Sequence, residues 1–496
     1  MKNEMSNIIQ SELSSLLIEL KENGKINDKD YKDLYAYLKK ICILLYTNKD
    51  NSPNRIFDLI IEDYLKAVKG ISILVPGLAT SIKDDKSGII LETYSGKTTN
   101  YGEVIDEETR FDLASVTKMF TSIEFLKLQE LGIIDSKQTI KDLSNGKYDL
   151  NFPISELPRF ARVLKTNGRI DEDISREEFE KRLHNSYLDE NEVFKYSDIP
   201  FIILKDLMPD DDYFKKFYKE EMGLLNTSYE RYGKMTGGNY TSIDLPHDPK
   251  ARNMMKFGYK EPGHAGIFST TRDLVMLYDN LKSGFLSKES IKNLITKAYK
   301  DDVIRLPGGN EININRAMGV YVKHSSGLKH SDVVPILSDE AFSIDGSSGT
   351  YTTYDLKNGL TANFLGNPFS RKEDKIIEVD NSEYTLKDTD SPFFDNGTLI
   401  KLCGKTLVLL DKKGDPITIV KDGKVVEDKN GNDEKVTISY SNITNTLKTM
   451  QIYTLLALRL SNKVLYKKAR LESDDYSRKV LDESGLGNNS RMIKKL

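Results

Sequence analysis

The amino-acid sequence predicts a mixed α/β (α+β) fold, because strand-like and helix-like segments alternate along the chain. Two β-type runs, 78–82 and 89–94, flank turn-forming residues at 84–88, which is the pattern of a strand, a turn and a returning strand. A one-sided apolar periodicity over residues 116–126 then predicts a helix that faces a core. Residues 340–366 again alternate glycine-rich turns with strand-like stretches.

A helical N-terminal extension is predicted over residues 1–70. Apolar side chains recur there at helical spacing in three segments, and turn-forming residues separate the segments. The three segments are marked by Leu13 and Leu17, by Leu34 and Leu38, and by Ile56 and Ile60. No motif with visible chemistry occurs in this extension.

The main domain is predicted to span residues 71–465. Turn signals such as the aspartate–glycine pair at 422–423 recur late in this range and predict a β-ribbon insertion over about residues 396–440. An apolar pattern over residues 443–460 predicts a long helix that closes the domain. Residues 466–496 are predicted to form a polar C-terminal tail.

Composition and charge exclude several classes of function. The 496 residues include 72 basic and 76 acidic side chains, a formal net charge of −4, which argues against nucleic acid as a partner. No apolar run reaches the length of a membrane span, and the N-terminus lacks the basic-then-apolar order of a signal peptide, so a cytoplasmic protein is expected. The two cysteines, Cys42 and Cys403, form no metal-ligand spacing.

The segment 111–118 carries the strongest chemical signal, because it places Ser115 three residues before Lys118 at the start of a predicted helix. Side chains at positions i and i+3 are neighbours on a helix surface. A serine hydroxyl is a weak nucleophile until a nearby base takes its proton. Burial or a neighbouring cation can lower the pKa of a lysine enough to make it that base. The spacing therefore suggests acyl transfer through a serine ester.

A second match to this spacing, Ser326 and Lys329, lies in a polar segment that we interpret as a loop, where a spacing of three has no helical meaning. The first match is followed by apolar residues up to Gly132, which suits a left-handed helix cap. The pattern alone also allows a second interpretation of Ser115, as a serine in a capping turn beside a solvated lysine.

Several segments together resemble the serine β-lactamases and penicillin-binding proteins, and most closely the class C β-lactamases and esterase-like serine hydrolases. The resemblance covers about residues 71–370. It rests on the nucleophile motif at 110–118, on Tyr196-Ser197-Asp198 in place of the usual Tyr-x-Asn, and on Gly346-Ser347-Ser348-Gly349-Thr350 where a third motif is expected. Segments 75–79, 246–251 and 263–270 resemble further signatures of esterase-like members.

The resemblance implies a β-lactamase/transpeptidase-like antiparallel sheet flanked by helices, with an inserted helical lobe. It implies that Ser115 is the acylated nucleophile, that Lys118 takes or relays its proton, and that Tyr196 is the general acid/base. It also implies an oxyanion hole formed by the backbone N–H groups of Ser115 and Ser347, next to Gly346. Without the resemblance, we would interpret Tyr196 as a core tyrosine beside a turn.

Two departures from the family pattern bear on the chemistry. Ile344 and Asp345 stand where a lysine or histidine and one further residue usually precede the glycine, so the basic side chain is absent there. Asp198 replaces the usual asparagine and adds negative charge, which raises the pKa of a nearby lysine. His247 and His264 are expected to be structural, because no carboxylate or cysteine lies at a metal spacing near either.

The sequence therefore predicts a serine hydrolase, with no cofactor and no metal, that acts through an acyl-enzyme on an ester, amide or β-lactam carbonyl. A small-molecule or peptide substrate is expected, with esterase-like or D-alanyl-peptidase-like activity favoured. Small p-nitrophenyl esters should react faster than penicillins unless a cation from elsewhere, such as Lys323 or Arg316, holds the β-lactam carboxylate. The alternative is a degenerate member that binds a ligand or a protein without turnover. The sequence leaves the oligomeric state open.

Overall fold

The computed structural model describes residues 77–367, apart from 87, 99–102, 211, 237–245, 302, 306–310, 324–332 and 334–336. It also describes scattered residues between 11 and 35 and short stretches between 375 and 439. The helix predicted at 443–460 and the tail predicted at 466–496 lie outside the described residues, as does most of the predicted extension at 1–70.

A six-stranded sheet forms the centre of the fold, in the order β10-β11-β12-β13-β1-β2, and each neighbouring pair is antiparallel. The strands are β1 (Gly77–Asp84), β2 (Ile89–Gly96), β10 (Tyr321–Val322), β11 (Phe342–Gly346), β12 (Thr350–Asp355) and β13 (Leu360–Gly366). The hairpin predicted at 78–94 is confirmed, because β1 pairs with β2. β1 also pairs with β13, with Leu78 opposite Gly366, so the two ends of this part of the chain meet inside the sheet.

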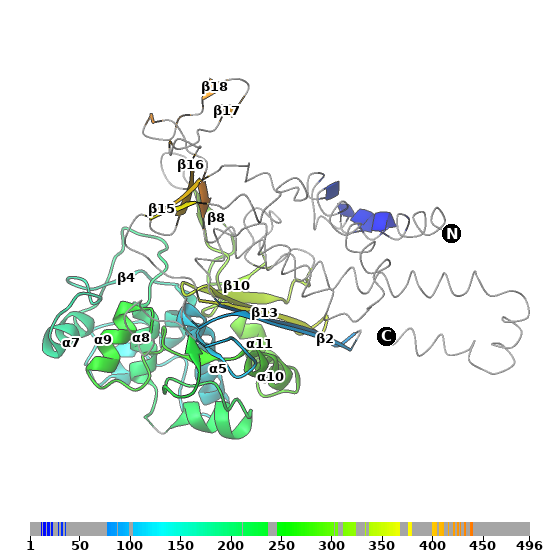
Figure 1. Ribbon diagram of the computed structural model, residues 1–496. Helices are drawn as coiled ribbons and strands as arrows, with labels where there is room; N and C mark the ends of the chain where they lie inside the picture. The colour runs from blue at the N-terminus through cyan, green and yellow to red at the C-terminus, as the bar shows by residue number, and fades with distance from the viewer. Residues whose placement is uncertain are drawn as a thin grey trace, which may run out of the picture.

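Three helices cover one face of this sheet: α5 (Thr117–Glu130), α10 (Thr271–Lys282) and α11 (Lys288–Leu294) (Figure 1). α10 packs on β1 and β13, and α11 packs on α5. α10 begins where the Thr270 hydroxyl caps the helix by accepting from the Asp273 N–H at 3.1 Å. The predicted end of α5 is confirmed, because Gly132 adopts a left-handed φ of +68°.

The chain between α5 and α10 forms the predicted inserted helical lobe. Its elements are α6 (Ile140–Leu143), η2 (Ile154–Arg159), β4 (Leu164–Lys165), α7 (Arg176–His184), β5 (Tyr187–Leu188), α8 (Ile199–Leu207), the π-helix η3 (Lys215–Glu221) and α9 (Pro249–Lys256). Helices α7, α8 and α9 group together beside α5 (Figure 1). Aromatic side chains such as Phe160 and Phe201 are fully buried and join the lobe to the core around α5.

A second, four-stranded sheet has the order β14-β15-β16-β19, formed by Lys375–Glu378, Leu399–Cys403, Thr406–Leu410 and Thr437–Ser439. β17 (Val420–Lys421) and β18 (Lys424–Val425) pair across residues 422–423, which confirms the hairpin predicted there. β8 (Val303–Arg305) and β9 (Glu311–Asn313) form a separate antiparallel pair. The division of the chain into an extension, a main domain with a ribbon insertion and a tail stays a prediction.

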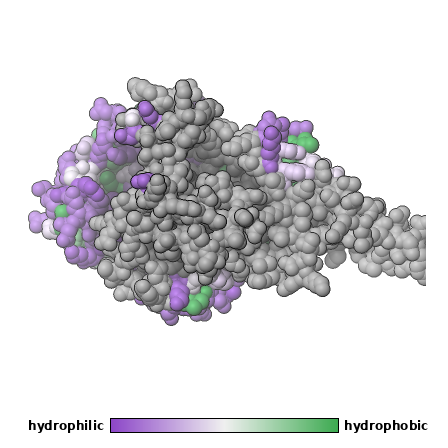
Figure 2. All heavy atoms as spheres, turned by 45° about the horizontal axis from the view of Figure 1, so that its top comes forward, coloured by the Kyte–Doolittle hydropathy of each residue, from purple (hydrophilic) through white to green (hydrophobic). Residues whose placement is uncertain are grey.

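Two further findings concern the predicted N-terminal helices and the possibility of a membrane-spanning helix. Those between 11 and 22 are helical, with Leu13 and Leu17 buried, in keeping with the first predicted segment. No helix in the described part of the chain is long and apolar enough to cross a membrane. The described side chains visible in Figure 2 are mainly hydrophilic, with a few small hydrophobic spots.

Candidate active site

A strained turn holds Ser115 at the start of α5. The helix predicted to open within 111–118 begins at Thr117. Before it, β3 (Arg110–Asp112) pairs with β6 (Met235–Thr236) and β7 (Phe268–Ser269), and the 3₁₀ turn η1 (Ala114–Val116) follows. Ala114 adopts a left-handed φ of 45°, which costs an alanine about 1–2 kcal/mol. The Asp112 carboxylate stabilises this conformation by accepting from the Ala114 N–H at 2.8 Å. The turn leaves the Ser115 side chain only partly buried.

Two buried charged residues anchor the strand that leads to this turn. The Arg110 guanidinium donates to the backbone carbonyls of Asn226 and Glu230, at 2.8 and 3.0 Å, and so ties the loop after the lobe to β3. Burial raises the pKa of Asp112 to about 6, although its carboxylate also accepts from the His247 N–H at 2.5 Å. The turn before Ser115 is therefore held from both sides by groups that have little freedom to move.

The structure brings together the three side chains that the sequence places in two separate motifs. Lys118 Nζ donates to Ser115 Oγ at 3.0 Å, and the Tyr196 hydroxyl lies 2.8 Å from the same oxygen. Lys118 is fully buried and also donates to the backbone carbonyl of His264 at 3.1 Å. Tyr196 is 38% exposed, so the interpretation of Tyr196 as a core tyrosine is wrong. Ser115 thus lies between a buried lysine and a solvent-facing phenol.

Asp198 controls the charge of Lys118. Burial lowers the pKa of Lys118, but the Asp198 carboxylate, whose Oδ1 lies 2.7 Å from Nζ, and the Tyr196 hydroxyl raise that pKa by more. Burial opposes ionisation of Asp198 as well, yet the Lys118 ammonium holds the pKa of that carboxyl below its ordinary range. The predicted effect of Asp198 on a nearby lysine is confirmed. The ion pair therefore opposes the lowering of the Lys118 pKa that would make this lysine a base, and the role of Lys118 as a base stays a prediction.

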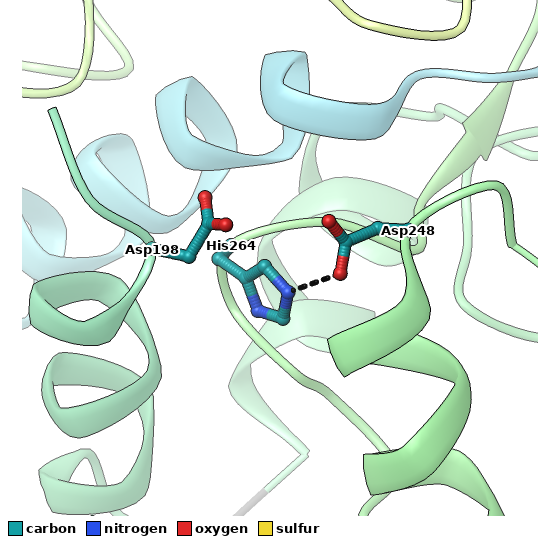
Figure 3. A group of neighbouring side chains, drawn as sticks. All are labelled: Asp198, Asp248 and His264. Atoms are coloured by element: carbon teal, nitrogen blue, oxygen red, sulfur yellow. Dashed lines mark hydrogen bonds and ion pairs between the residues drawn. The ribbon is translucent and has the colours of Figure 1, made fainter. Parts of the chain in front are cut away.

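Two carboxylates gather around His264, which corrects the expectation that none lies near it. One oxygen each of Asp198 and Asp248 and one ring nitrogen of His264 lie within 4.8 Å of one another (Figure 3). His264 Nε2 is 3.0 Å from Asp248 Oδ1, the oxygen that caps α9 through the N–H groups of Lys250 and Ala251. These residues have the ligand types of a metal site.

Ion pairs already compensate the charge of this cluster. Lys118 binds one oxygen of Asp198, and Lys250 Nζ lies 3.1 Å from the other. A divalent cation would have to displace these ammonium groups or lie beside them, and both are unfavourable. The residues therefore fit a structural role, in which His264 and Asp248 fix the chain segment whose carbonyl receives Lys118.

The third-motif hairpin lies against the nucleophile turn. A Cβ on Gly346 would lie 2.3 Å from the backbone carbonyl oxygen of Leu113, so only glycine fits there. Thr350 Oγ1 donates to the same carbonyl at 3.0 Å. Ser347 is exposed in the turn between β11 and β12. Ile344 is 2% exposed and packs in the core, so it presents no polar group to the site.

The sequence identified Arg316 only as a cation outside the three motifs, whereas in the structure it lies at the site. The Arg316 guanidinium lies 4.2 Å from the centre of the Tyr196 ring. The other residue named in that way, Lys323, is engaged by the Leu337 carbonyl at 2.7 Å and by Asp339. A cation is therefore available at the site, although the third motif lacks its usual basic residue. The alternative pair Ser326 and Lys329 lies outside the described residues.

The site consists of a serine, a lysine and a tyrosine that lie close together at one turn. This turn lies between an antiparallel sheet and the helix that packs on the sheet. The sequence model of the Beta-lactamase family matches residues 75–381, which is more than half of the 496 residues. The chain therefore belongs to the Beta-lactamase family, as the motifs predicted, and its fold is the predicted β-lactamase/transpeptidase-like one.

Solved structures with a similar fold include FmtA from Staphylococcus aureus, at 16% identity and a TM-score of 0.44, over 64% of this chain and 85% of that one. A class C beta-lactamase has 12% identity and a TM-score of 0.46, over 66% and 94%. EstCE1, described as a hydrolase with promiscuous acyltransferase activity, has 14% identity and a TM-score of 0.48, over 63% and 94%. A comparison with curated protein sequences finds no match.

Proposed function

We propose that this protein is a serine hydrolase that works through an acyl-enzyme on Ser115. One observation carries the proposal: Ser115 Oγ lies within hydrogen-bond distance of both Lys118 Nζ, at 3.0 Å, and the Tyr196 hydroxyl, at 2.8 Å. A nucleophile in contact with a candidate base, at a helix start that favours negative charge, is the arrangement that covalent catalysis requires.

Tyr196 accepts the proton in this mechanism, because Lys118 is already protonated. Lys118 Nζ lies 5.1 Å from the centre of the Tyr196 ring, and the Arg316 guanidinium lies on that ring. Two cations therefore lie close to the group that receives the proton. Ser115 Oγ attacks the substrate carbonyl, its proton passes to Tyr196, and Tyr196 returns that proton to the leaving oxygen or nitrogen as its bond to the carbonyl carbon breaks.

A water molecule then hydrolyses the acyl-enzyme, and the same steps run in reverse with water in the place of the leaving group. Tyr196 takes a proton from the water as the water oxygen attacks the ester carbonyl, and Tyr196 returns that proton to Ser115 Oγ as the bond between Oγ and the carbonyl carbon breaks. The backbone N–H groups of Ser115 and Ser347 are the proposed donors to the oxyanion, since the hairpin at Gly346 packs on the turn before Ser115. Such a donor is often worth about 3 kcal/mol of transition-state stabilisation. An esterase-like or peptidase-like substrate is favoured.

Mass spectrometry after incubation with a fluorophosphonate probe, and separately with a penicillin, tests the proposal. A covalent adduct should map to the peptide that contains Ser115, and Ser115→Ala should abolish labelling while the melting temperature is retained. An adduct at Ser326 would contradict the assignment. No adduct and no turnover of any ester would favour the alternative of a family member that binds a ligand or protein without turnover.

A further inference from the structure

Three charged side chains form a buried network beside α5 that the proposed mechanism does not use. Lys205 Nζ lies 2.7 and 2.8 Å from the two carboxylate oxygens of Glu124 and 2.5 Å from one oxygen of Glu261. Glu124 is 2% exposed, and the Lys205 side chain is 10% exposed. Burial lowers the pKa of Lys205, but the two carboxylates raise that pKa by more. Apolar side chains can often replace a buried ion pair at no cost in stability, so stability alone does not explain this network.

The network joins the two helices that carry Lys118 and its ionic partner. Glu124 lies on α5, six residues after Lys118. Lys205 lies on α8, which packs on α5 and has Asp198 as its N-cap residue. Because helices are stiff elements, the pair of Glu124 with Lys205 constrains how far Asp198 Oδ1 lies from Lys118 Nζ, which is 2.7 Å.

The network also holds the loop that supplies another acceptor to Lys118. Glu261 and Gly263 precede His264 in this loop, and the His264 carbonyl accepts from Lys118 Nζ at 3.1 Å. A Cβ on Gly263 would lie 2.5 Å from Lys205 Cβ, so the loop packs directly on α8. The ion pair of Glu261 with Lys205 holds the loop at this contact, and it thereby keeps the His264 carbonyl within reach of Lys118.

We propose that Glu124, Lys205 and Glu261 are positioning residues that hold the Lys118 ammonium group beside Ser115. This inference rests on the proposed function, in which that ammonium group lies next to the phenol that receives the proton of Ser115. The three residues take no part in the proton transfers, and they act through the acceptors of Lys118. A misplacement of about 1 Å at a reacting centre can cost a hundredfold in rate, so loss of the network should slow acylation without changing how the substrate binds.

A double variant that replaces the central pair by apolar side chains tests the proposal. Glu124→Met with Lys205→Met fills the space of the pair and should retain the melting temperature. The maximal rate of Ser115 labelling by the fluorophosphonate probe should fall by roughly tenfold to a hundredfold, at an unchanged half-saturating probe concentration. Glu124→Gln keeps an acceptor for Lys205 and should label close to the wild-type rate. Lys147→Met is the matched control, because it breaks the 2.7 Å ion pair of Lys147 with Asp206, the next residue of α8, and it should label at the wild-type rate.

A second readout needs no catalysis by the protein. Acetic anhydride modifies neutral amines, so Lys118 in its ion pair with Asp198 should react far more slowly than Lys141, whose side chain is 52% exposed. Mass spectrometry of one digest, after modification of the folded protein, measures both lysines. In the double variant, acetylation of Lys118 relative to Lys141 should become roughly tenfold faster, which is the effect of one pKa unit.

The two readouts separate this inference from the proposed function. A folded double variant in which Lys118 is acetylated at the wild-type rate would overturn the inference, as would an equal loss of labelling in Lys147→Met. Faster acetylation of Lys118, with no adduct on Ser115 in any form of the protein, would support the positioning of Lys118 and reject the proposed function. If the double variant does not fold, Glu261→Ala releases the loop alone, and it must give both changes for the inference to stand.

Discussion

Lys118 Nζ lies 2.7 Å from Asp198 Oδ1, and this ion pair forms the electrostatic centre of the site. Lys118 is fully buried, and its ammonium group also contacts Ser115 Oγ and the His264 carbonyl. Asp198 occupies the position at which the family usually has asparagine. In the proposed mechanism the proton acceptor for Ser115 is therefore Tyr196, and both the stability and the activity of the protein should depend on the pair.

The stability of the protein should fall at both ends of the pH range because of this pair. The folded state lowers the pKa of Asp198, so the stabilisation from this carboxylate is complete above about pH 4 and is lost as the pH falls further. The folded state raises the pKa of Lys118, so its stabilisation is complete below about pH 10 and is lost as the pH rises further. Urea unfolding of the wild type and of Asp198→Asn across this pH range measures the loss of stability at low pH and at high pH.

Asp198→Asn should lower the free energy of unfolding at pH 7 by about 3 kcal/mol, since it leaves a buried lysine unpaired. It should also weaken the pH dependence of stability at both low and high pH. Asp149→Asn is the matched control, because it breaks the exposed Lys141–Asp149 pair at 2.8 Å and should cost far less stability than Asp198→Asn. Equal losses in the two variants would mean that the Lys118–Asp198 pair is screened by solvent.

Tyr196→Phe should slow acylation by at least about a hundredfold, the lower end of what a positioned acid/base contributes. The substitution removes the hydroxyl at 2.8 Å from Ser115 Oγ and keeps the ring on which Arg316 stacks. The rate of fluorophosphonate labelling provides the measurement. Tyr232→Phe removes a hydroxyl from a tyrosine that is 39% exposed, and it should label at the wild-type rate. Wild-type labelling in Tyr196→Phe would remove Tyr196 from the mechanism.

Lys118→Ala should also slow acylation by at least about a hundredfold, because the cation beside Ser115 and Tyr196 is lost. It should cost about 3 kcal/mol of stability as well, since the buried Asp198 carboxylate loses one of its two lysine partners and keeps only Lys250. The double variant Lys118→Met with Asp198→Asn removes both charges and should regain stability but not activity. Recovery of labelling in the double variant would show that Lys118 serves the fold alone.

Gly346→Ala should impair catalysis more than stability. The new Cβ would lie 2.3 Å from the Leu113 carbonyl oxygen, so the hairpin must move away from the turn that carries Ser115. Overpacking of this kind costs about 1–3 kcal/mol, whereas a misplacement of about 1 Å in a site can cost a hundredfold in rate. Labelling rate and melting temperature measured on one preparation separate the two effects. A normal labelling rate would argue against the proposed oxyanion donor at Ser347.

The sequence by itself determined the family and the parts whose signals are local. The serine–lysine spacing at 115 and 118, the hairpin at 78–94, the helix cap at Gly132 and the glycine at 346 each depend on residues that are neighbours along the chain. Such features follow from backbone geometry and short-range hydrogen bonds, so pattern and spacing are enough to predict them. The pairing of β3 with β6 and β7 escaped prediction, because it joins segments that are far apart in sequence.

Only the tertiary structure decided the electrostatics of the site. Whether Lys118 is a base or a cation depends on the 2.7 Å contact with Asp198, a residue of a different motif. The approach of Asp198 and Asp248 to His264 and the stacking of Arg316 on Tyr196 likewise join segments that are far apart in sequence. Coulomb energies change steeply with distance and burial, and neither quantity can be read from spacing along a chain. The packing of α5, α8, α9 and the edge of the sheet sets those distances, and it therefore sets which protons and charges Ser115 meets.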